Sequence, residues 1–200
     1  MTVMLHNGKI IAVTKAIWKP GTMLYPAPAV LVSCGDQPDN YNLITIAWTG
    51  TICSEPAMTY VSIRPTRHSH EIISRTGEFV INLTTKKLAF AVDYCGVRSG
   101  KKINKFKEMK LTPARSDQVS APLILESPLN IECRVTERKP LGSHDMFIAK
   151  VLCIHADKRY IDKKGAFNFQ ATEPICYSHG KYYLLGKEIG HFGYSVRKKK

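Results

Sequence analysis

The chain has 200 residues, of which 44% are hydrophobic and 22% are charged, and its formal net charge is +13. A chain of this length can bury a core without disulfide or metal crosslinks, and this composition excludes a disordered or collagen-like protein. Lys9, Lys15 and Lys19 interrupt the apolar residues near the start, so neither a signal peptide nor a membrane-spanning helix is expected. We therefore expect a cytoplasmic protein.

The positive charge is concentrated in two segments. Residues 197–200 carry four cations, which are typical of a solvated tail. Residues 98–115 carry seven cations against Glu108 alone, and such a local excess suits a bound anion. The six cysteines lie far apart without a CxxC pair, which favours reduced and mostly buried thiols.

The first half of the chain predicts a series of short strands. Residues 1–25 have little periodicity and read as an irregular arm, after which residues 30–34 form the first strand. Residues 35–40 have turn chemistry and connect it to an apolar strand at 43–53, with Trp48 in its middle. Residues 58–64 alternate and form a second strand that pairs with it, and Pro65 ends this strand.

The next segment predicts two helices around a fourth strand. A short helix follows Arg67 and stops at Gly77, and the strand covers residues 78–83. Thr84 or Thr85 caps a second helix, and Gly96 follows its end. The apolar residues of this helix have helical spacing: Leu88, Ala91, Val92 and Cys95.

The second half predicts antiparallel pairing. Residues 129–135 alternate between apolar and polar, so one face of this strand is expected to be wet, and residues 146–155 pair with it. Residues 162–165 form a turn, and further strands lie at 176–177 and 182–185. We therefore expect a mainly β protein, an antiparallel β-barrel with helical insertions, as one domain over residues 1–200 with an arm (1–20) and a basic tail (194–200).

The sequence gives little support for several other types of functional site. No GxGxxG is present, and the glycines at 96 and 100 have neither the spacing nor the preceding strand of a phosphate loop. His68 and His70 lack further residues that would complete a metal site by spacing. Ser143, His144 and Asp145 lack a nucleophile elbow, and neighbouring side chains on a strand point apart. By composition alone, Trp48 is a core residue and Arg64 and Arg67 are surface cations.

Taken in order, a set of segments resembles the flavin reductase-like family of FMN-binding split barrels, which includes the flavoredoxins. The resemblance runs from about residue 21 to about residue 193. The segments that carry it are KPGTMLYPAPAVLVSC, NLITIAWTGTICSEP, SIRPTRHS, TGEFVINL, DYCGVRSGKKINKF, PLNIEC, GSHDMFIAKV and PICYSHGKYY. It implies a six-stranded antiparallel split β-barrel, a homodimer, and FMN in a groove close to the subunit interface.

The resemblance also implies which residues contact FMN. They are Asn42, Trp48, Ser69, Lys105 and His144, followed by Thr45, Thr49, Arg64, Arg67, Lys101 and Tyr177. The chemistry of these side chains agrees, because a phosphate needs cations and hydroxyl or amide donors, and a flavin ring needs a flat apolar neighbour. Lys105 or His144 near the pyrimidine edge would tune the potential of the flavin.

The expected function is an NAD(P)H-dependent flavin oxidoreductase, with no catalytic side chain because the flavin carries the chemistry and with no metal. One alternative is a flavoredoxin-type electron carrier that a partner protein reduces. Another is a basic barrel that binds nucleic acid, but the aromatic residues do not interleave with the cations as stacking platforms would. We expect neither nucleic acid nor a membrane as a partner.

Overall fold

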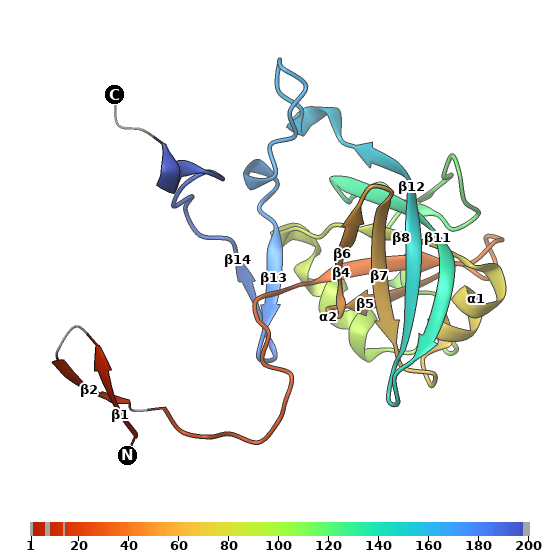
Figure 1. Ribbon diagram of the computed structural model, residues 1–200. Coiled ribbons are helices and arrows are strands. Elements are labelled where there is room, and N and C mark those ends of the chain that lie inside the picture. Colours follow the sequence, from red (N-terminus) through yellow and green to blue (C-terminus); the bar gives the residue numbers. More distant parts are fainter. Residues whose placement is uncertain (1, 7–8, 14, 198–200) are drawn as a thin grey trace.

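The computed structural model describes residues 2–6, 9–13 and 15–197. Its largest sheet is antiparallel and has the strand order β5-β4-β8-β11-β12-β7-β6 (Figure 1). These strands are β4 (Val30–Cys34), β5 (Asn42–Ile46), β6 (Thr49–Ser54), β7 (Ala57–Ile63), β8 (Glu78–Asn82), β11 (Leu129–Pro140) and β12 (Asp145–Ala156).

The sheet curls into a barrel because its two edge strands are consecutive in the chain. β5 and β6 lie at opposite edges, yet only Ala47 and Trp48 separate them. Three peptide steps span at most about 11 Å, so the edges must approach each other closely. The curled antiparallel sheet confirms the split barrel that the sequence predicted.

The prediction of one continuous strand over residues 43–53 is wrong. The chain bends at Ala47 and Trp48, so the sheet has seven strands where six were expected. Of the expected strand pair, β6 pairs with β7, whereas β5 pairs with β4. Composition could not show this bend, because the residues on both sides of it are equally suited to a strand.

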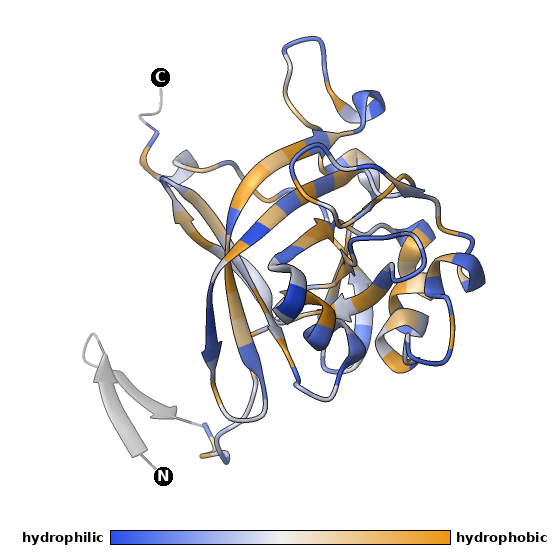
Figure 2. Cartoon of the chain, turned by 90° about the vertical axis from the view of Figure 1, so that its right-hand side faces the viewer, coloured by the Kyte–Doolittle hydropathy of each residue, from blue (hydrophilic) through white to orange (hydrophobic). Residues whose placement is uncertain are grey.

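β4 separates two apolar layers, which explains why all five of its residues are buried. Val30 and Val32 pack inside the barrel with Phe79 and Phe147. Leu31, on the other face, packs beneath a helix in a second cluster. Side chains alternate across a strand, so a strand between two apolar layers reads as a continuous hydrophobic run. Polar and apolar residues alternate more visibly along the longer strands (Figure 2).

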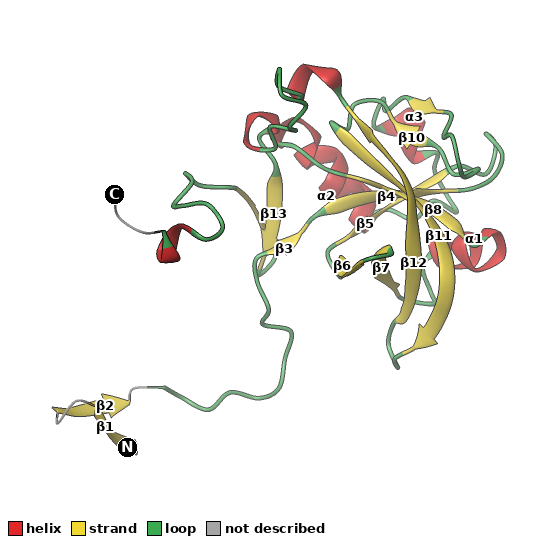
Figure 3. Ribbon diagram, turned by 45° about the horizontal axis from the view of Figure 1, so that its top comes forward, coloured by secondary structure: helices red, strands yellow, loops and turns green. Residues whose placement is uncertain are grey.

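Short helices cover the barrel (Figure 3). They are α1 (His68–Thr76), the 3-10 turn η1 (Lys86–Leu88), α2 (Ala89–Val97) and α3 (Lys105–Glu108). α1 ends as predicted at Gly77, which has a φ of 69° and donates its N–H to the Ile73 carbonyl.

The second helix begins and ends at other residues than the sequence predicted. The chain first forms η1, and the Thr84 hydroxyl donates to the Ala29 carbonyl, so neither threonine side chain caps a helix. Gly96 lies within α2 and does not follow it. A Cβ there would lie 3.3 Å from the Thr45 Cβ, so glycine allows α2 to pack closely on β5.

The prediction that one face of β11 is exposed to solvent is wrong for the first half of the strand. Asn130 and Glu132 are buried, because the segment with β9 (Pro113–Ala114) and β10 (Leu123–Ile124) covers them. Asn130 donates to the Asn82 side chain and to the Ile124 carbonyl. The sequence showed the alternation but not that the preceding segment folds back over this face of the strand.

The ends of the chain add smaller elements. β3 (Ala27–Pro28), β13 (Ile175–Ser178) and β14 (Lys181–Leu184) form a three-stranded sheet beside the barrel, and η2 (Lys158–Tyr160), η3 (Gln170–Thr172) and η4 (Tyr194–Val196) are short 3-10 turns. β1 (Thr2–His6) and β2 (Lys9–Val13) pair antiparallel, which corrects the expectation of an irregular arm for these residues, whereas residues 15–25 are irregular as expected. Within the described ranges, no helix combines the length and apolar character needed to cross a membrane.

Candidate functional site

A groove of about 290 Å³ opens where the two edges of the barrel meet. Its walls come from β5, the Ala47–Trp48 bend, the end of β7 and the β13–β14 hairpin. The predicted residues that line it are Thr45, Trp48, Arg64, Arg67, His144 and Tyr177. Sequence reasoning missed Tyr182, which lines the same groove.

The bend between β5 and β6 determines the position of Trp48. Its backbone carbonyl accepts a hydrogen bond from the Ser62 N–H at 2.9 Å, which fixes the bend against β7. The side chain is half-buried and its ring centroid lies 6.2 Å from that of Tyr25. The ring centroid of Tyr25 in turn lies 6.0 Å from that of Tyr177. Trp48 is therefore a wall of the groove and does not belong to the buried core.

A second, polar pocket of about 130 Å³ continues the groove, since Ile44 and Arg67 line both. It lies between the start of α1, the end of α2 and the loop after α2. The predicted residues in its lining are Asn42, Arg67, Ser69 and Lys105, and the lining that sequence reasoning missed includes His68, Arg98, Ser99 and Gly100. The groove thus changes from aromatic to cationic along its length.

Lys105 is a buried cation, with only 4% of its surface exposed. Its Nζ donates to the carbonyl oxygens of Leu43 and Cys95, both at 2.7 Å. An ammonium has three N–H donors, so these bonds leave one for the pocket. Burial lowers the pKa of Lys105, and the neighbouring Cys95 thiol acts in the opposite direction. The two carbonyl bonds hold the ammonium at a fixed point in the wall.

Asn42 and Ser69 form a buried polar pair. The Asn42 Nδ2 donates to the Ser69 hydroxyl at 2.8 Å, and Ser69 is the second residue of α1. Gly100 lies so close that a Cβ there would come within 2.0 Å of the Asn42 Oδ1. Gly100 therefore leaves the space that the Asn42 amide occupies.

His68 carries a buried ring nitrogen, Nδ1, that lacks a hydrogen-bond partner in the described part of the chain. Buried polar atoms are normally paired, so an unpaired one in a residue that lines a pocket is a candidate for a ligand contact. Burial lowers the pKa of His68, and Lys101 and Lys105 act in the same direction. Sequence reasoning considered a functional role for His68 only as a metal ligand, although its place beside Ser69 at the start of a helix was a usable signal.

Two arginines follow the end of β7 in the chain, and both are exposed. Neither Arg64 nor Arg67 forms an ion pair with an acidic side chain within the described residues. His144 lies opposite them in the groove, and its Nδ1 is 2.9 Å from the Ser143 hydroxyl. Burial and the nearby Arg64 lower the pKa of His144 and so favour its neutral imidazole.

Two predicted residues, Lys101 and Thr49, lie less centrally than the sequence suggested, and His70 lines none of these pockets. Lys101 lines a shallow third pocket, which Asn42 and His68 also line. Thr49 lines none of these three pockets, because its side chain is buried and donates to the Tyr60 carbonyl at 2.5 Å. His70 bonds to the Asp145 carboxylate at 2.9 Å and has a structural role between α1 and β12.

Comparison with known proteins points in the same direction. Residues 22–186 match the family model of the flavin reductase like domain. A protein of Pyrococcus abyssi is 35% identical over 145 residues, which are 72% of this chain and 79% of that protein. The NADH-dependent FMN reductase AsuE2 of Streptomyces nodosus subsp. asukaensis is 26% identical over 144 residues, 69% of this chain and 74% of that protein.

A solved structure is similar over nearly the whole chain. Flavoredoxin of Desulfovibrio vulgaris (Miyazaki F) superposes with a TM-score of 0.84 at 25% sequence identity. The superposition covers 92% of this chain and 100% of the flavoredoxin chain.

Proposed function

Because the chain belongs to the flavin reductase-like family, we propose that it binds FMN in this groove and passes electrons from NADH or NADPH to an acceptor. The acceptor classes that fit are free flavin, iron or a protein. The observation that carries the proposal is the continuity of the groove, which joins an aromatic wall to a pocket with a buried ammonium and an unpartnered imidazole nitrogen.

The polar pocket suits the phosphate of FMN. Lys105, Arg67 and the first turn of α1 supply positive charge, and Ser69 and Asn42 supply uncharged donors. His68 would donate from its unpartnered nitrogen to a phosphate oxygen, which satisfies that buried atom. Arg98 and Lys101 at the rim add to the positive field.

The aromatic half suits the flavin ring. Trp48 and Tyr177 offer flat apolar surfaces, and Ile44 and Ile46 line the floor between them. The imidazole of His144 and the guanidinium of Arg64 are polar groups that line this half. Thr45 contributes little beyond shape, since its hydroxyl donates to the Val92 carbonyl of α2.

FMN, when bound, supplies the redox chemistry of hydride uptake and electron release. The side chains of this protein position the cofactor and exclude water from one side of the groove. Arg64 would also stabilise negative charge that develops on the reduced ring, because a cation at short range in a partly buried site acts strongly. No nucleophile or general acid is required of the chain.

The test is a binding and reduction experiment with the purified full-length protein. We expect one FMN per chain in an absorbance titration, and bleaching of the bound flavin when NADH or NADPH is added without oxygen. Protein that neither binds added FMN nor oxidises either nucleotide would contradict the proposal.

A second candidate is an electron carrier, which the similarity to flavoredoxin favours. A carrier would bind FMN equally well but would be reduced slowly or not at all by NADH and NADPH. Stopped-flow mixing of the FMN-bound protein with each nucleotide separates the two candidates. Binding of nucleic acid is less well supported, because Lys105 in the basic segment is buried and already bonded to two carbonyls.

We further propose that the protein acts as a homodimer in the cytoplasm. Exposed apolar side chains in the arm and near the other end of the chain support a dimer, since a second copy would cover them: Ile17, Trp18, Leu24, Ile189 and Phe192. The six free cysteines suit a reducing compartment. Light scattering after size-exclusion chromatography tests the dimer, and a mass near that of a single chain would refute it.

A further inference from the structure

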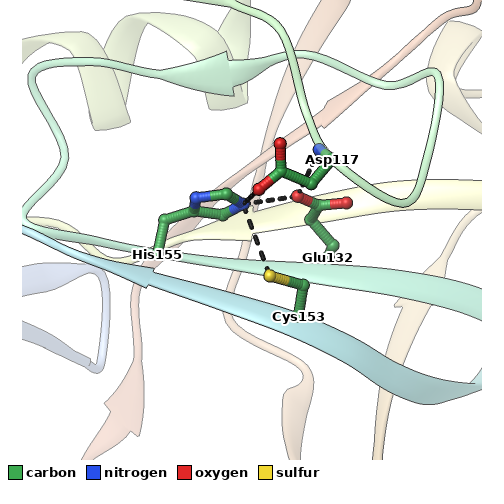
Figure 4. A group of neighbouring side chains, drawn as sticks. All are labelled: Asp117, Glu132, Cys153 and His155. Carbon is green, nitrogen blue, oxygen red and sulfur yellow. Dashed lines mark hydrogen bonds and ion pairs between the residues drawn. The ribbon is translucent and has the colours of Figure 1, made fainter.

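Four side chains with metal-binding atoms converge at a place that the flavin proposal does not use. They are Asp117, Glu132, Cys153 and His155, and one ligand atom from each lies within 4.8 Å of all the others (Figure 4). None of them lines the groove or the polar pocket.

The strand register brings three of these residues together. Glu132 on β11 is directly opposite Cys153 on β12, and His155 lies two residues further on the same face. The register shifts after this pair, because Cys133 is opposite Val151 and Leu152 has no partner. A bulge of this kind changes the direction of the side chains beside it. Here it turns Cys153 toward the buried carboxylate of Glu132.

Glu132 is held firmly in place. Its side chain is 0% exposed, and its carboxylate accepts N–H bonds from three consecutive residues: Asp117 at 2.8 Å, Gln118 at 2.6 Å and Val119 at 3.1 Å. These bonds also fix the backbone of Asp117, whose own carboxylate is the exposed member of the group. The neighbouring backbone thus orients the ligand atoms before any ion binds, as it does in natural metal sites.

The distances fit a tetrahedral ion with little movement. Bond lengths of about 2.0 Å to nitrogen or oxygen and 2.3 Å to sulfur place neighbouring ligand atoms roughly 3.3–3.6 Å apart. The His155 Nε2 lies 3.6 Å from the Cys153 Sγ and 3.8 Å from the Asp117 Oδ2. The 2.5 Å hydrogen bond from His155 to the Glu132 Oε1 must lengthen, since the ion would replace the proton between them, and no pair of ligand atoms needs to close from more than 4.8 Å.

The charges also favour a cation. Two carboxylates, from Glu132 and Asp117, lie beside one imidazole and one thiol. Arg134 does not offset them, because its guanidinium bonds to Glu78 and to the Gln118 carbonyl. A divalent ion would neutralise the group and allow Cys153 to bind as the thiolate.

We propose that Asp117, Glu132, Cys153 and His155 form a binding site for one divalent transition-metal ion, and that zinc is the best match. Mixed sulfur, nitrogen and oxygen ligands in tetrahedral geometry suit zinc better than magnesium or calcium, which bind oxygen ligands. The ion would join the segment around Asp117 to β11 and β12 and so stabilise the cover of the barrel. This site does not depend on the proposed flavin function.

The test uses full-length protein stripped with a chelator and then titrated with zinc by calorimetry, and with cobalt by visible absorbance. We expect one zinc per chain, and a cobalt spectrum with tetrahedral d–d bands and a thiolate charge-transfer band. Cys153→Ser should abolish that band, and Asp117→Asn, a change at an exposed residue, should weaken zinc binding at least about 10-fold.

Cys53→Ser is the matched control, because Cys53 is also half-buried, its thiol donates to the Glu55 carbonyl, and it does not belong to the group of four. This variant should retain wild-type zinc affinity and an unchanged cobalt spectrum. Thermal unfolding with and without zinc checks that each variant folds. Failure of the wild-type protein to bind zinc, or equal binding by wild type, Cys153→Ser and Asp117→Asn, would show that the four side chains form a hydrogen-bonded group only.

Discussion

The close contact between Gly100 and Asn42 provides a sharp test of the polar pocket. In a Gly100→Ala variant the new Cβ would lie 2.0 Å from the Asn42 Oδ1 and 2.7 Å from its Cγ, so the amide must move. The backbone at Gly100 has no positive φ, so alanine adds no strain there. The variant therefore perturbs the pocket through a single side chain.

The expected loss follows from the bonds of Asn42. Moving the amide breaks its 2.8 Å bond to the Ser69 hydroxyl and withdraws a donor from the phosphate. One or two hydrogen bonds of this kind are worth about 1–2 kcal/mol in total, which corresponds to roughly 5- to 30-fold weaker FMN binding. Calorimetric titration with FMN measures the change.

Two comparisons make the result specific. Gly186→Ala is the control, because a Cβ at Gly186 meets no atom within 4 Å. In an Asn42→Ala background, Gly100→Ala should cost almost nothing, since the side chain that it displaces is already absent. Additive losses in the double variant would refute this reasoning, as would an unchanged FMN affinity in Gly100→Ala alone.

Three further changes test other parts of the account. Trp48→Ala should weaken FMN binding roughly 5- to 100-fold through lost stacking, without unfolding the protein, as titration and circular dichroism can show. Lys105→Met should weaken FMN binding and also lower the free energy of unfolding by about 2–4 kcal/mol in urea, because two buried carbonyls lose their donor. Glu132→Gln should destabilise the protein by about 2–4 kcal/mol at pH 7, because the amide cannot accept all of the backbone N–H bonds that the carboxylate accepts. The pKa of Glu132 is lowered in the folded protein, because its hydrogen bonds outweigh the opposing effect of burial. The carboxylate therefore contributes its full stabilisation of the fold above the unfolded pKa of about 4.3, and this stabilisation is lost as the pH falls through the lower folded pKa. Urea unfolding at several pH values should therefore show the gap between wild type and Glu132→Gln closing in acid, and a constant gap would contradict this.

Local signals in the sequence predicted the elements that depend on neighbouring residues. The strand at Val30–Cys34 and the helix that ends at Gly77 were predicted almost to the residue. Both have strong local causes, an apolar β-branched run and a glycine that can adopt the left-handed conformation. The order of the family segments then predicted the barrel, which no single segment could.

The errors concern features that depend on tertiary contacts. Asn130 and Glu132 look like solvent-facing residues until the segment at 113–124 is placed over them. Gly96 looks like the end of a helix until β5 is packed against it. The unpartnered nitrogen of His68 becomes apparent only when the pocket around it is formed. Each of these positions is defined by tertiary contacts, which local propensity does not contain.

The most direct test of the flavin site uses the two tryptophans of the chain as reporters. Trp18 is 73% exposed, so a Trp18→Phe variant should fold normally and leave Trp48 as the sole tryptophan. Titration of this variant with FMN should quench the Trp48 fluorescence strongly and saturate at one FMN per chain, because the flavin ring would lie against the indole. Fluorescence that stays unchanged while FMN binds, or absence of FMN binding, would contradict the proposed groove.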